Sequence, residues 1–407
     1  MEKEKNIFFY HCFKSYYSDN LIFEGEYLNG KRKEFYNNSK PKFEGEYLNG
    51  VRNGKGKEYY NDGQLKYDGE YLNGKIWNGI FYDRDLGIET EIKNGNGIVI
   101  ENYDNGYIKF KGEYINGEKN GKGIEYYGDS EGKIKYEGEY LNGKKWTGKT
   151  YFTINYKIFE HKIKNGNGNI IEYYDNGYKK FNGKYTNGEK NGQGKEYYYF
   201  SNIKRYEGEF LNGKRNGKGK EYYHGLELKY DGEFLNGKRN GIGKEYNYDR
   251  KLIFEGEYLN GKRNGKGKEY NDFGVLIFEG EFINDYKSKG KFYVKGKLEY
   301  EGEFKIRKKW NGNGYDKKGK IIYTLINGTG KVQEYNDFGV LIFEGEYLNG
   351  EKNGKAKEYH EKNGKMSFRV EYLDGVRNGK AKEYDEYGKL IFNGEFINGI
   401  KIPKKYN

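Results

Sequence analysis

The most complete chemical motif in this chain is a nucleotide-binding string. Residues 143–150, GKKWTGKT, match the pattern G-x-x-x-x-G-K-[ST] in full. A phosphate-binding loop needs a buried strand before it and a helix after it, because backbone amides and the helix N-terminus hold the phosphates. Here the string begins at an Asn-Gly pair and is followed by TYFTINYKIF, which is typical of a strand. We therefore predict that no nucleotide and no cofactor binds at this string.

The other groups that could support catalysis or bind a metal are scattered. His11, His161, His224 and His360 lie far apart, and the single cysteine, Cys12, stands beside the first of them. A structural zinc site needs four Cys or His ligands, and a cysteine nucleophile needs a positioned base. Carboxylates are abundant but recur at the same places along the chain, whereas a catalytic pair would be a local exception. The sequence predicts no catalytic residue, no metal site and no enzyme.

Composition narrows the class of protein further. The 407 residues include 63 Gly and only 2 Pro, and 18% are aromatic. Frequent Gly disfavours helices, scarce Pro excludes collagen, and abundant aromatics argue against disorder. No apolar run reaches the ~18 residues of a membrane-spanning helix, and the charged start MEKEKNIFFYHCF does not resemble a signal peptide. With its single cysteine, the chain is expected to be intracellular and cytoplasmic, either free or at a membrane surface.

The elements that must position any site come from one repeated segment, FEGEYLNGKRNGKGKEYND. Aligned on the Gly of an aromatic-x-Gly-x-aromatic pattern, it recurs in 17 registers from Gly25 to Gly394, a mean period of about 23 residues. Four degenerate copies carry another residue at that anchor position: Thr90, His161, Tyr323 and Val370. A fixed period of this size indicates a repeat array rather than a set of globular domains.

Each copy is predicted to be a β-hairpin. In residues 43–60 the first strand alternates with period 2, and Asn-Gly, a strong hairpin signal, follows it. A turn centred near residues 51–52 would place Glu46 opposite Lys57 and Tyr47 over Gly56. Joined by second turns, the hairpins form an all-β fold: an elongated, open, twisted, single-layer antiparallel meander of about 34 strands. We expect a capping segment at 1–20, the array at 21–400 and a tail at 401–407.

These residues resemble the MORN repeat. The family pattern appears in Gly45-Glu46-Tyr47-Leu48-Asn49-Gly50 with Gly54-Lys55-Gly56, and again in residues 256–261 with 265–267. The resemblance covers about residues 21–400 and implies an array of about 17 MORN-type hairpins. It implies functions such as scaffolding, dimerisation and membrane-associated adaptor roles, and for one bacterial subgroup an antitoxin-like role that neutralises a partner. No domain usually fused to such arrays is visible.

Three tryptophans mark places where the period changes. Trp77, Trp146 and Trp310 each stand eight residues after an anchor glycine, and a shortened, degenerate copy follows each of them. Residues 69–112, 138–183 and 302–345 thus form three double-length units. Either each Trp fills the space left by the missing contact, or the three Trp contact a partner, since Trp is enriched at binding hot spots.

The net charge of +12 gathers in the hairpin turns. Stacked hairpins would align pairs such as Lys214-Arg215, Lys238-Arg239 and Lys262-Arg263 along one edge. This edge could discourage sheet-to-sheet pairing or bind acidic phospholipids such as phosphoinositides. Glutamates on the same strands argue against nucleic acid. The function expected first is a non-catalytic scaffold that binds protein partners, as yet unidentified, or a second copy of itself. Peripheral binding to acidic membrane lipids is the alternative, and the antitoxin-like role comes third.

Overall fold

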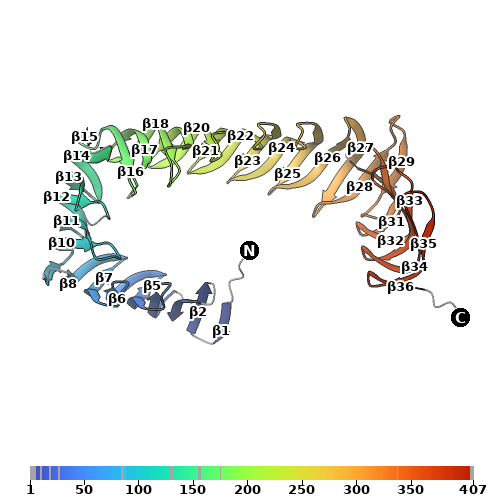
Figure 1. Ribbon diagram of the computed structural model, residues 1–407. Coiled ribbons are helices and arrows are strands. Elements are labelled where there is room, and N and C mark those ends of the chain that lie inside the picture. Colours follow the sequence, from blue (N-terminus) through green and yellow to red (C-terminus); the bar gives the residue numbers. More distant parts are fainter. Residues whose placement is uncertain are drawn as a thin grey trace. The chain divides into compact units, whose positions relative to one another are not determined.

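The computed structural model shows a chain made of antiparallel hairpins (Figure 1). It describes residues 6–9, 12–17, 20–25, 28–83, 87, 89–128, 132–154, 157–174, 176–336 and 338–403. Among these residues there are 36 strands and no helix, and hence none long and apolar enough to cross a membrane. The strands are β1 (Asn6–Phe9), β2 (Cys12–Tyr17), β3 (Asn20–Gly25), β4 (Gly30–Phe35), β5 (Pro41–Leu48), β6 (Val51–Tyr59), β7 (Leu65–Leu72), β8 (Lys75–Tyr82), β9 (Glu89–Lys93), β10 (Asn96–Asn102), β11 (Ile108–Ile115), β12 (Glu118–Tyr126), β13 (Ile134–Leu141), β14 (Lys144–Ile154), β15 (Lys157–Ile163), β16 (Gly168–Tyr173), β17 (Lys179–Thr186), β18 (Glu189–Tyr197), β19 (Lys204–Leu211), β20 (Lys214–Tyr222), β21 (Leu228–Leu235), β22 (Lys238–Tyr246), β23 (Leu252–Leu259), β24 (Lys262–Tyr270), β25 (Leu276–Ile283), β26 (Tyr286–Val294), β27 (Lys297–Lys305), β28 (Lys308–Tyr315), β29 (Ile321–Leu325), β30 (Gly330–Tyr335), β31 (Leu341–Leu348), β32 (Glu351–Tyr359), β33 (Met366–Leu373), β34 (Val376–Tyr384), β35 (Leu390–Ile397) and β36 (Ile400–Pro403).

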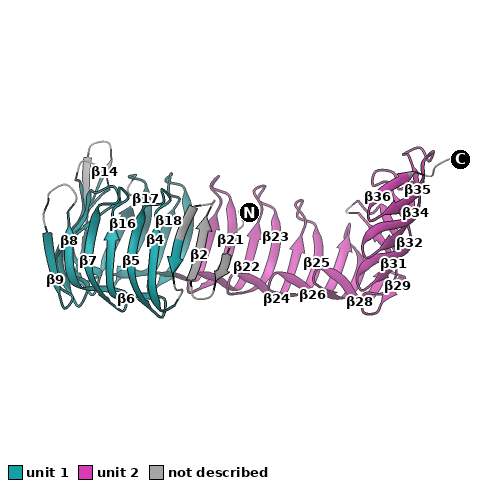
Figure 2. Cartoon of the chain, turned by 90° about the horizontal axis from the view of Figure 1, so that it is seen from below, with its two compact units in different colours: residues 1–214 teal, residues 215–407 magenta. Residues whose placement is uncertain are grey.

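Strand order follows chain order in each of three sheets, as a series of hairpins requires. The sheets hold β1–β15, β16–β29 and β30–β36, and all are open. The chain divides into two compact units, residues 1–214 and 215–407 (Figure 2). The predicted all-β antiparallel meander is confirmed. Two details at its ends are new: β1 and β2 continue the sheet ahead of the first repeat, and β36 extends to Pro403.

The pairing within a hairpin differs from the predicted register. Lys57 lies opposite Glu44, not Glu46. The turn between β5 and β6 centres on residues 49–50, earlier than predicted, because Asn49 takes a positive φ of 52° and the turn needs only two residues. A bulge in the ladder then shifts the pairing of the residues further from the turn.

The core of each hairpin is one aromatic ring lying across two glycines. Gly45 and Gly56 are directly opposite, and a Cβ on either would lie 2.5 or 2.8 Å from the Phe43 ring. Only glycine therefore lets the ring reach the backbone. The predicted packing of rings over glycines is confirmed, but the ring is Phe43 and not Tyr47. Beyond the bulge, the Tyr47 hydroxyl instead donates to Glu34 of the preceding repeat at 2.5 Å.

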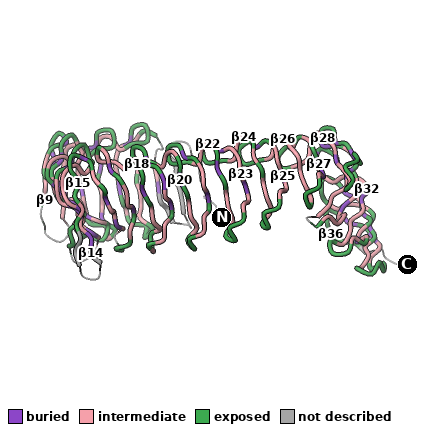
Figure 3. Tube along the Cα trace, turned by 90° about the horizontal axis from the view of Figure 1, so that it is seen from above, coloured by how far each residue is buried: buried purple, intermediate pink, exposed green. Residues whose placement is uncertain are grey.

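The rings of successive hairpins touch one another. Phe254 is fully buried and makes edge-to-face contacts with Tyr258 of its own hairpin and Phe282 of the next, with ring centroids 5.4 and 5.2 Å apart. Figure 3 shows buried positions recurring within the strands and exposed positions gathering at the turns. We call the side of each sheet that carries these rings the aromatic face, and the opposite side, which carries residues such as Glu255 and Lys268, the charged face.

The pairing of strands weakens in the three shortened hairpins. Between β15 and β16 one bridge, Lys164 to Asn167, closes the turn, and between β29 and β30 the one bridge is Ile326 to Thr329. The hairpin β9–β10 keeps two paired positions beside its turn. In the described part of the chain, the sheets separate at the second and third of these hairpins. The irregular spacing seen in the sequence therefore coincides with breaks in strand pairing.

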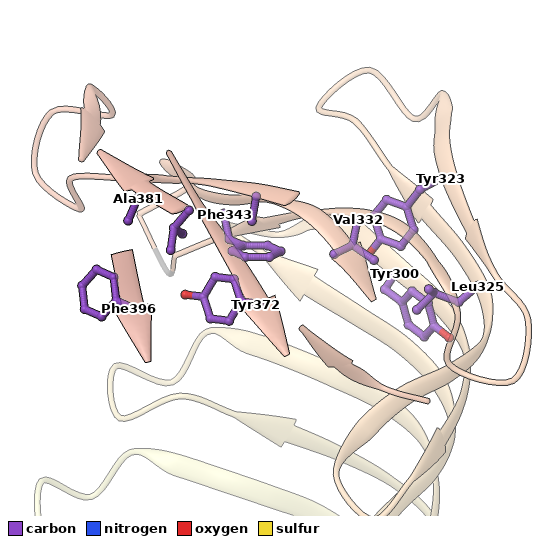
Figure 4. Close-up of a cluster of buried hydrophobic side chains, with 10 residues drawn as sticks. Tyr300, Tyr323, Leu325, Val332, Phe343, Tyr372, Ala381 and Phe396 are labelled. Atoms are coloured by element: carbon purple, nitrogen blue, oxygen red, sulfur yellow. The ribbon is translucent and has the colours of Figure 1, made fainter. Parts of the chain in front are cut away.

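In unit 2, side chains larger than the usual glycines pack at the break in strand pairing between β29 and β30. Tyr323 and Leu325 of β29 lie beside Val332 of β30 in a buried cluster that continues toward Phe396 (Figure 4). In this cluster, positions that are glycine in the regular hairpins carry larger residues. They are Val332, Ala356, Val370 and Ala381.

Candidate interaction surfaces

Three of the predicted lipid contacts are arginines that the structure places on the aromatic face. Arg239 bridges Glu221, at 2.8 Å, and Glu245, and Arg263 binds Glu245 at 2.6 Å. Arg215 binds Glu221 at 2.6 Å. The three arginine side chains are at most 20% exposed. Their charges are therefore committed to a ladder of ion pairs that links neighbouring repeats.

This ladder controls the ionisation of its carboxylates. Burial alone would raise the pKa of Glu245, but the Arg263 and Arg239 guanidiniums outweigh burial and hold that pKa below its usual value. Arg239 and Arg263 also lie over aromatic rings, Tyr230 at 4.2 Å and Phe254 at 4.3 Å. The pairs therefore cover the rings, and the aromatic face is not an open apolar surface.

The three predicted lysine contacts lie at the tips of the hairpins. Lys214, Lys238 and Lys262 begin β20, β22 and β24, and all three are exposed. Leu235 and Leu259 lie opposite Lys238 and Lys262 and are 49% and 51% exposed. These two tips thus each present one aliphatic side chain beside one ammonium group.

The aliphatic row along this edge was not predicted. We call the edge formed by the Asn-Gly turns and their equivalents the turn edge. In unit 2, each described turn of this edge exposes an aliphatic side chain just before or within the turn. These residues are Leu235, Leu259, Ile283, Ile306, Ile326, Leu348, Leu373 and Ile397. The segment FEGEYL indicates this row, because its residues alternate between the two faces of the sheet. The leucine therefore lies on the charged face, next to the turn.

Hydrogen bonds between repeats hold the turns in line. The amide of Gly261 donates to the carbonyl of Arg239 at 2.8 Å, and the amide of Asn260 donates to the Asn240 side chain at 3.2 Å. The same two contacts recur at other turns, for example from Asn398 to Asn378 at 3.1 Å. The turn edge is therefore a fixed row of tips and not a set of independent loops.

One tip has neither the Asn nor the Gly that the other tips carry. Ile306 and Arg307 have φ values of 48° and 67°, which a β-branched residue and a long side chain rarely adopt. Ile306 is 76% exposed, and lysines flank the pair on both sides. The Lys305 ammonium lies 4.6 Å from the Trp310 ring centroid. Strained, exposed residues of this kind concentrate at functional sites.

The three tryptophans occupy equivalent places on β8, β14 and β28, the strands that precede the shortened hairpins. Each ring lies against the turn glycine of the shortened copy, where an added Cβ would come within 2.9 Å of the ring. The backbone carbonyl of each Trp also accepts a hydrogen bond from that glycine. The pairs are Trp77 with Gly95, Trp146 with Gly166 and Trp310 with Gly328. This packing accounts for the Trp positions; contact with a partner stays a prediction.

An ion pair crosses each shortened hairpin. The lysine begins the strand that precedes the shortened hairpin: β8, β14 or β28. The glutamate begins the second strand that follows the hairpin: β12, β18 or β32. The pairs are Lys75 with Glu118 at 2.9 Å, Lys144 with Glu189 at 2.9 Å, and Lys308 with Glu351. The three double-length units are thus one structural motif built three times.

The nucleotide-binding string has no phosphate-binding geometry. It lies at the β13–β14 turn and along β14, which is followed by another strand and not by a helix. Its lysine, Lys149, forms an ion pair with Glu160 at 3.1 Å across those strands. His161 stacks on Phe152, and burial lowers its pKa. In the part of the chain that the structure describes, no three His, Cys, Asp or Glu residues are grouped as metal ligands; the side chains of His11 and Cys12 lie outside it.

Two grooves follow the charged face in unit 2. One, of about 640 Å³, is lined by five lysines and four glutamates of β22–β27. The other, of about 800 Å³, extends from β29 to β35. In both grooves the lining combines charged side chains with the Gly, Ala or Val residues that stand between them.

Comparison with known proteins identifies the repeat. A family model described as the MORN repeat matches residues 43–65, 110–131, 181–199, 206–224, 230–250, 254–274 and 343–365. No curated protein matches the chain.

Matches among solved structures are distant. They include the crystal structure of TcdB2-TccC3-Cdc42, with 8% identity over 93% of this chain and 22% of that one, and a TM-score of 0.13. A structure of the Photorhabdus luminescens Tc holotoxin pore has 10% identity over 95% of this chain and 23% of that one, and a TM-score of 0.14. The chain spans about a quarter of those toxin chains, and scores this low carry no argument about function.

Proposed function

This chain belongs to the MORN-repeat proteins, and from that premise we propose that it is an intracellular, non-catalytic scaffold that binds other proteins through its turn edge. The observation that carries the proposal is the row of exposed aliphatic side chains at the tips, such as Leu235, Leu259 and Ile283. An apolar stripe bordered by charged residues is typical of a protein interaction site. A row with one tip per repeat suits a scaffold, because one partner can contact several tips at once.

Self-association is the second form that this function can take. The strand β36 ends the last sheet and leaves one side without a neighbouring strand in the described chain. An open strand edge can pair with the same edge of a second copy, related by a two-fold axis. Ile400 and Ile402 on this strand are 67% and 43% exposed, which adds apolar surface to such a contact.

Two measurements on the intact chain test the proposal. We expect light scattering to show a dimer, or affinity capture with mass spectrometry to recover specific partner proteins. A strictly monomeric chain that recovers no partner from lysate would contradict the proposal. A turnover assay is not informative at first, because no described group of residues suggests a reaction to assay.

Peripheral binding to acidic phospholipids is a second candidate, favoured by the tip at residues 305–308. There Ile306 is the most exposed aliphatic residue of the turn edge, and Lys305, Arg307 and Lys308 surround it. Apolar side chains flanked by ammonium groups suit an anionic membrane surface, where each cation contributes about 1 kcal/mol. Lys238 and Lys262 would extend the contact along the same edge.

Liposome sedimentation tests this second candidate. We expect binding to vesicles that contain phosphatidylserine or phosphoinositides, weaker binding at high salt, and no binding to phosphatidylcholine alone. The double variant Lys238→Glu/Lys262→Glu should bind less. Lys266→Glu/Lys268→Glu, with the same charge change away from the edge, should bind like the wild type. Binding that is insensitive to salt and to the edge variant would exclude this function.

A further inference from the structure

The charge pattern of the charged face breaks in the last hairpins. In the regular part of unit 2, acids and bases alternate from strand to strand, so that Glu255 lies opposite Lys244 on one side and Lys268 on the other. In β32–β34 the glutamate is replaced by Arg369, which lies opposite Lys357 and Lys382. The next acidic position, on β35, is also lost, since Asn393 lies opposite Lys382.

Three cations therefore stand side by side on adjacent strands. Like charges directly opposite each other destabilise a sheet, so this arrangement costs stability. Lys357 has a carboxylate partner in Glu344 at 3.6 Å. In the described chain, no carboxylate forms an ion pair with Arg369 or Lys382, and both are exposed. A local rule that is broken at a stability cost indicates a functional site.

These cations line the groove of about 800 Å³. Its walls carry six cations and three carboxylates: Lys331, Lys355, Lys357, Arg369, Lys380 and Lys382, with Glu344, Glu346 and Glu371. The regular groove of about 640 Å³ is nearly balanced, with five lysines and four glutamates. The excess of positive charge thus belongs to the groove of the last hairpins and is not shared by the regular groove of unit 2.

We propose that this groove binds an acidic peptide segment of a partner protein. This proposal rests on the proposed scaffold function and adds the chemistry of the partner. Lys357, Arg369 and Lys382 lie on three successive strands and span about 10 Å. That span equals three to four residues of extended peptide, so two or three acidic side chains of one segment can reach all three cations. The interspersed Glu346 and Glu371 oppose a continuous run of phosphates, and Ile322 offers an apolar contact at one end.

Fluorescence anisotropy with the full chain tests this proposal. The probe is a labelled twelve-residue peptide made of three Glu-Leu-Glu-Gly units, and its control has Gln in place of every Glu. We expect salt-sensitive binding of the acidic peptide alone. Arg369→Glu should weaken that binding about tenfold, because it restores the regular alternation and removes the central cation. Lys268→Glu, which makes the same charge change in the regular groove, should alter binding less than about twofold.

Thermal unfolding separates loss of the site from loss of the fold. Arg369→Glu should melt at or above the wild-type temperature, because it replaces two repulsive contacts with attractive ones. Equal peptide binding by Arg369→Glu and wild type, or an equal loss in Lys268→Glu, would overturn the proposal. So would Arg369-dependent binding of a twelve-residue oligothymidylate or of anionic vesicles in place of the peptide. If the acidic peptide does not bind while affinity capture still recovers partners, the acidic-peptide proposal is wrong and the scaffold function stands. If the peptide does not bind and no partner is recovered, both proposals are wrong.

Discussion

The guanidinium carbon of Arg263 lies 4.3 Å from the centroid of the Phe254 ring, and the same side chain is bonded to Glu245 and Glu269. The aromatic core and the charge ladder of the aromatic face are therefore one structure. The arginine covers the ring and neutralises carboxylates from two repeats. A single-layer sheet has no second layer to bury its rings, and this contact takes the place of one.

Removing that arginine should destabilise the array. Arg263→Ala removes one cation from Glu245, which keeps Arg239, and one from Glu269, which keeps Lys287. It also uncovers the Phe254 ring, so we expect a loss of about 2 kcal/mol. Urea unfolding followed by circular dichroism measures the loss. The adjacent exposed residue provides the control, and Lys262→Ala should cost less than about 0.5 kcal/mol. Equal effects of the two substitutions would show that the ladder contributes nothing to stability.

The ladder should also make stability fall in acid. The pKa of Glu245 is lowered in the folded chain, so its contribution is present above its ordinary value of 4.5 and is lost as the pH falls through the folded pKa. Glu245→Gln should therefore reduce the difference in unfolding free energy between about pH 7 and about pH 3. Glu281→Gln, an exposed change on the charged face, should leave that difference unaltered. An unchanged pH dependence in Glu245→Gln would contradict the role given to the arginines.

The strained tip should be improved by the residues found at the other turns. Ile306→Asn/Arg307→Gly places the common Asn-Gly pair at two positive φ values, and we expect stabilisation by about 1–2 kcal/mol. The reverse exchange at a regular turn, Asn260→Ile/Gly261→Arg, should destabilise by a similar amount. Thermal melts of the two variants give the answer. A loss of stability in the first variant would mean that the flanking contacts of Ile306 and Arg307 outweigh the backbone strain.

The packing of the Trp rings can be tested through their glycine partners. Gly95 and Gly143 are both turn glycines, with φ of 73° and 77°, so a new Cβ strains the backbone equally at either place. At Gly95 the Cβ would also meet the Trp77 ring and the amide of Gly117, whereas at Gly143 it would meet nothing within 4 Å. Gly95→Ala should therefore cost about 1–3 kcal/mol more than Gly143→Ala.

Trp77→Ala completes this comparison. If the ring is a packing element, the variant loses stability but keeps its partners in affinity capture. Lost binding at unchanged stability would assign the ring to an interface instead.

The sequence was sufficient for the architecture but not for the pairing. Period-2 alternation and the Asn-Gly pairs predict the hairpins, because both signals are local. The register was wrong because a bulge in each ladder leaves no mark in the alternation, so Glu44 rather than Glu46 pairs with Lys57. The Arg of each Lys-Arg pair could not be assigned to the aromatic face without that register. In the sequence, Arg369 stands where most regular copies carry a carboxylate. That it lowers the stability of the sheet is apparent only from the structure, which places Lys357 and Lys382 opposite it.

Affinity capture with an altered turn edge tests the central claim most directly. The variant Leu235→Ser/Leu259→Ser/Ile283→Ser removes three exposed tips, and Leu226→Ser/Val275→Ser/Leu390→Ser removes three exposed aliphatic residues from turns at the opposite edge. Partner proteins recovered with each chain are quantified by mass spectrometry at equal bait concentration. We expect the turn-edge variant to lose the partners of the wild type while the opposite-edge variant retains them. Equal recovery by both variants would contradict the claim that this MORN array works through its turn edge.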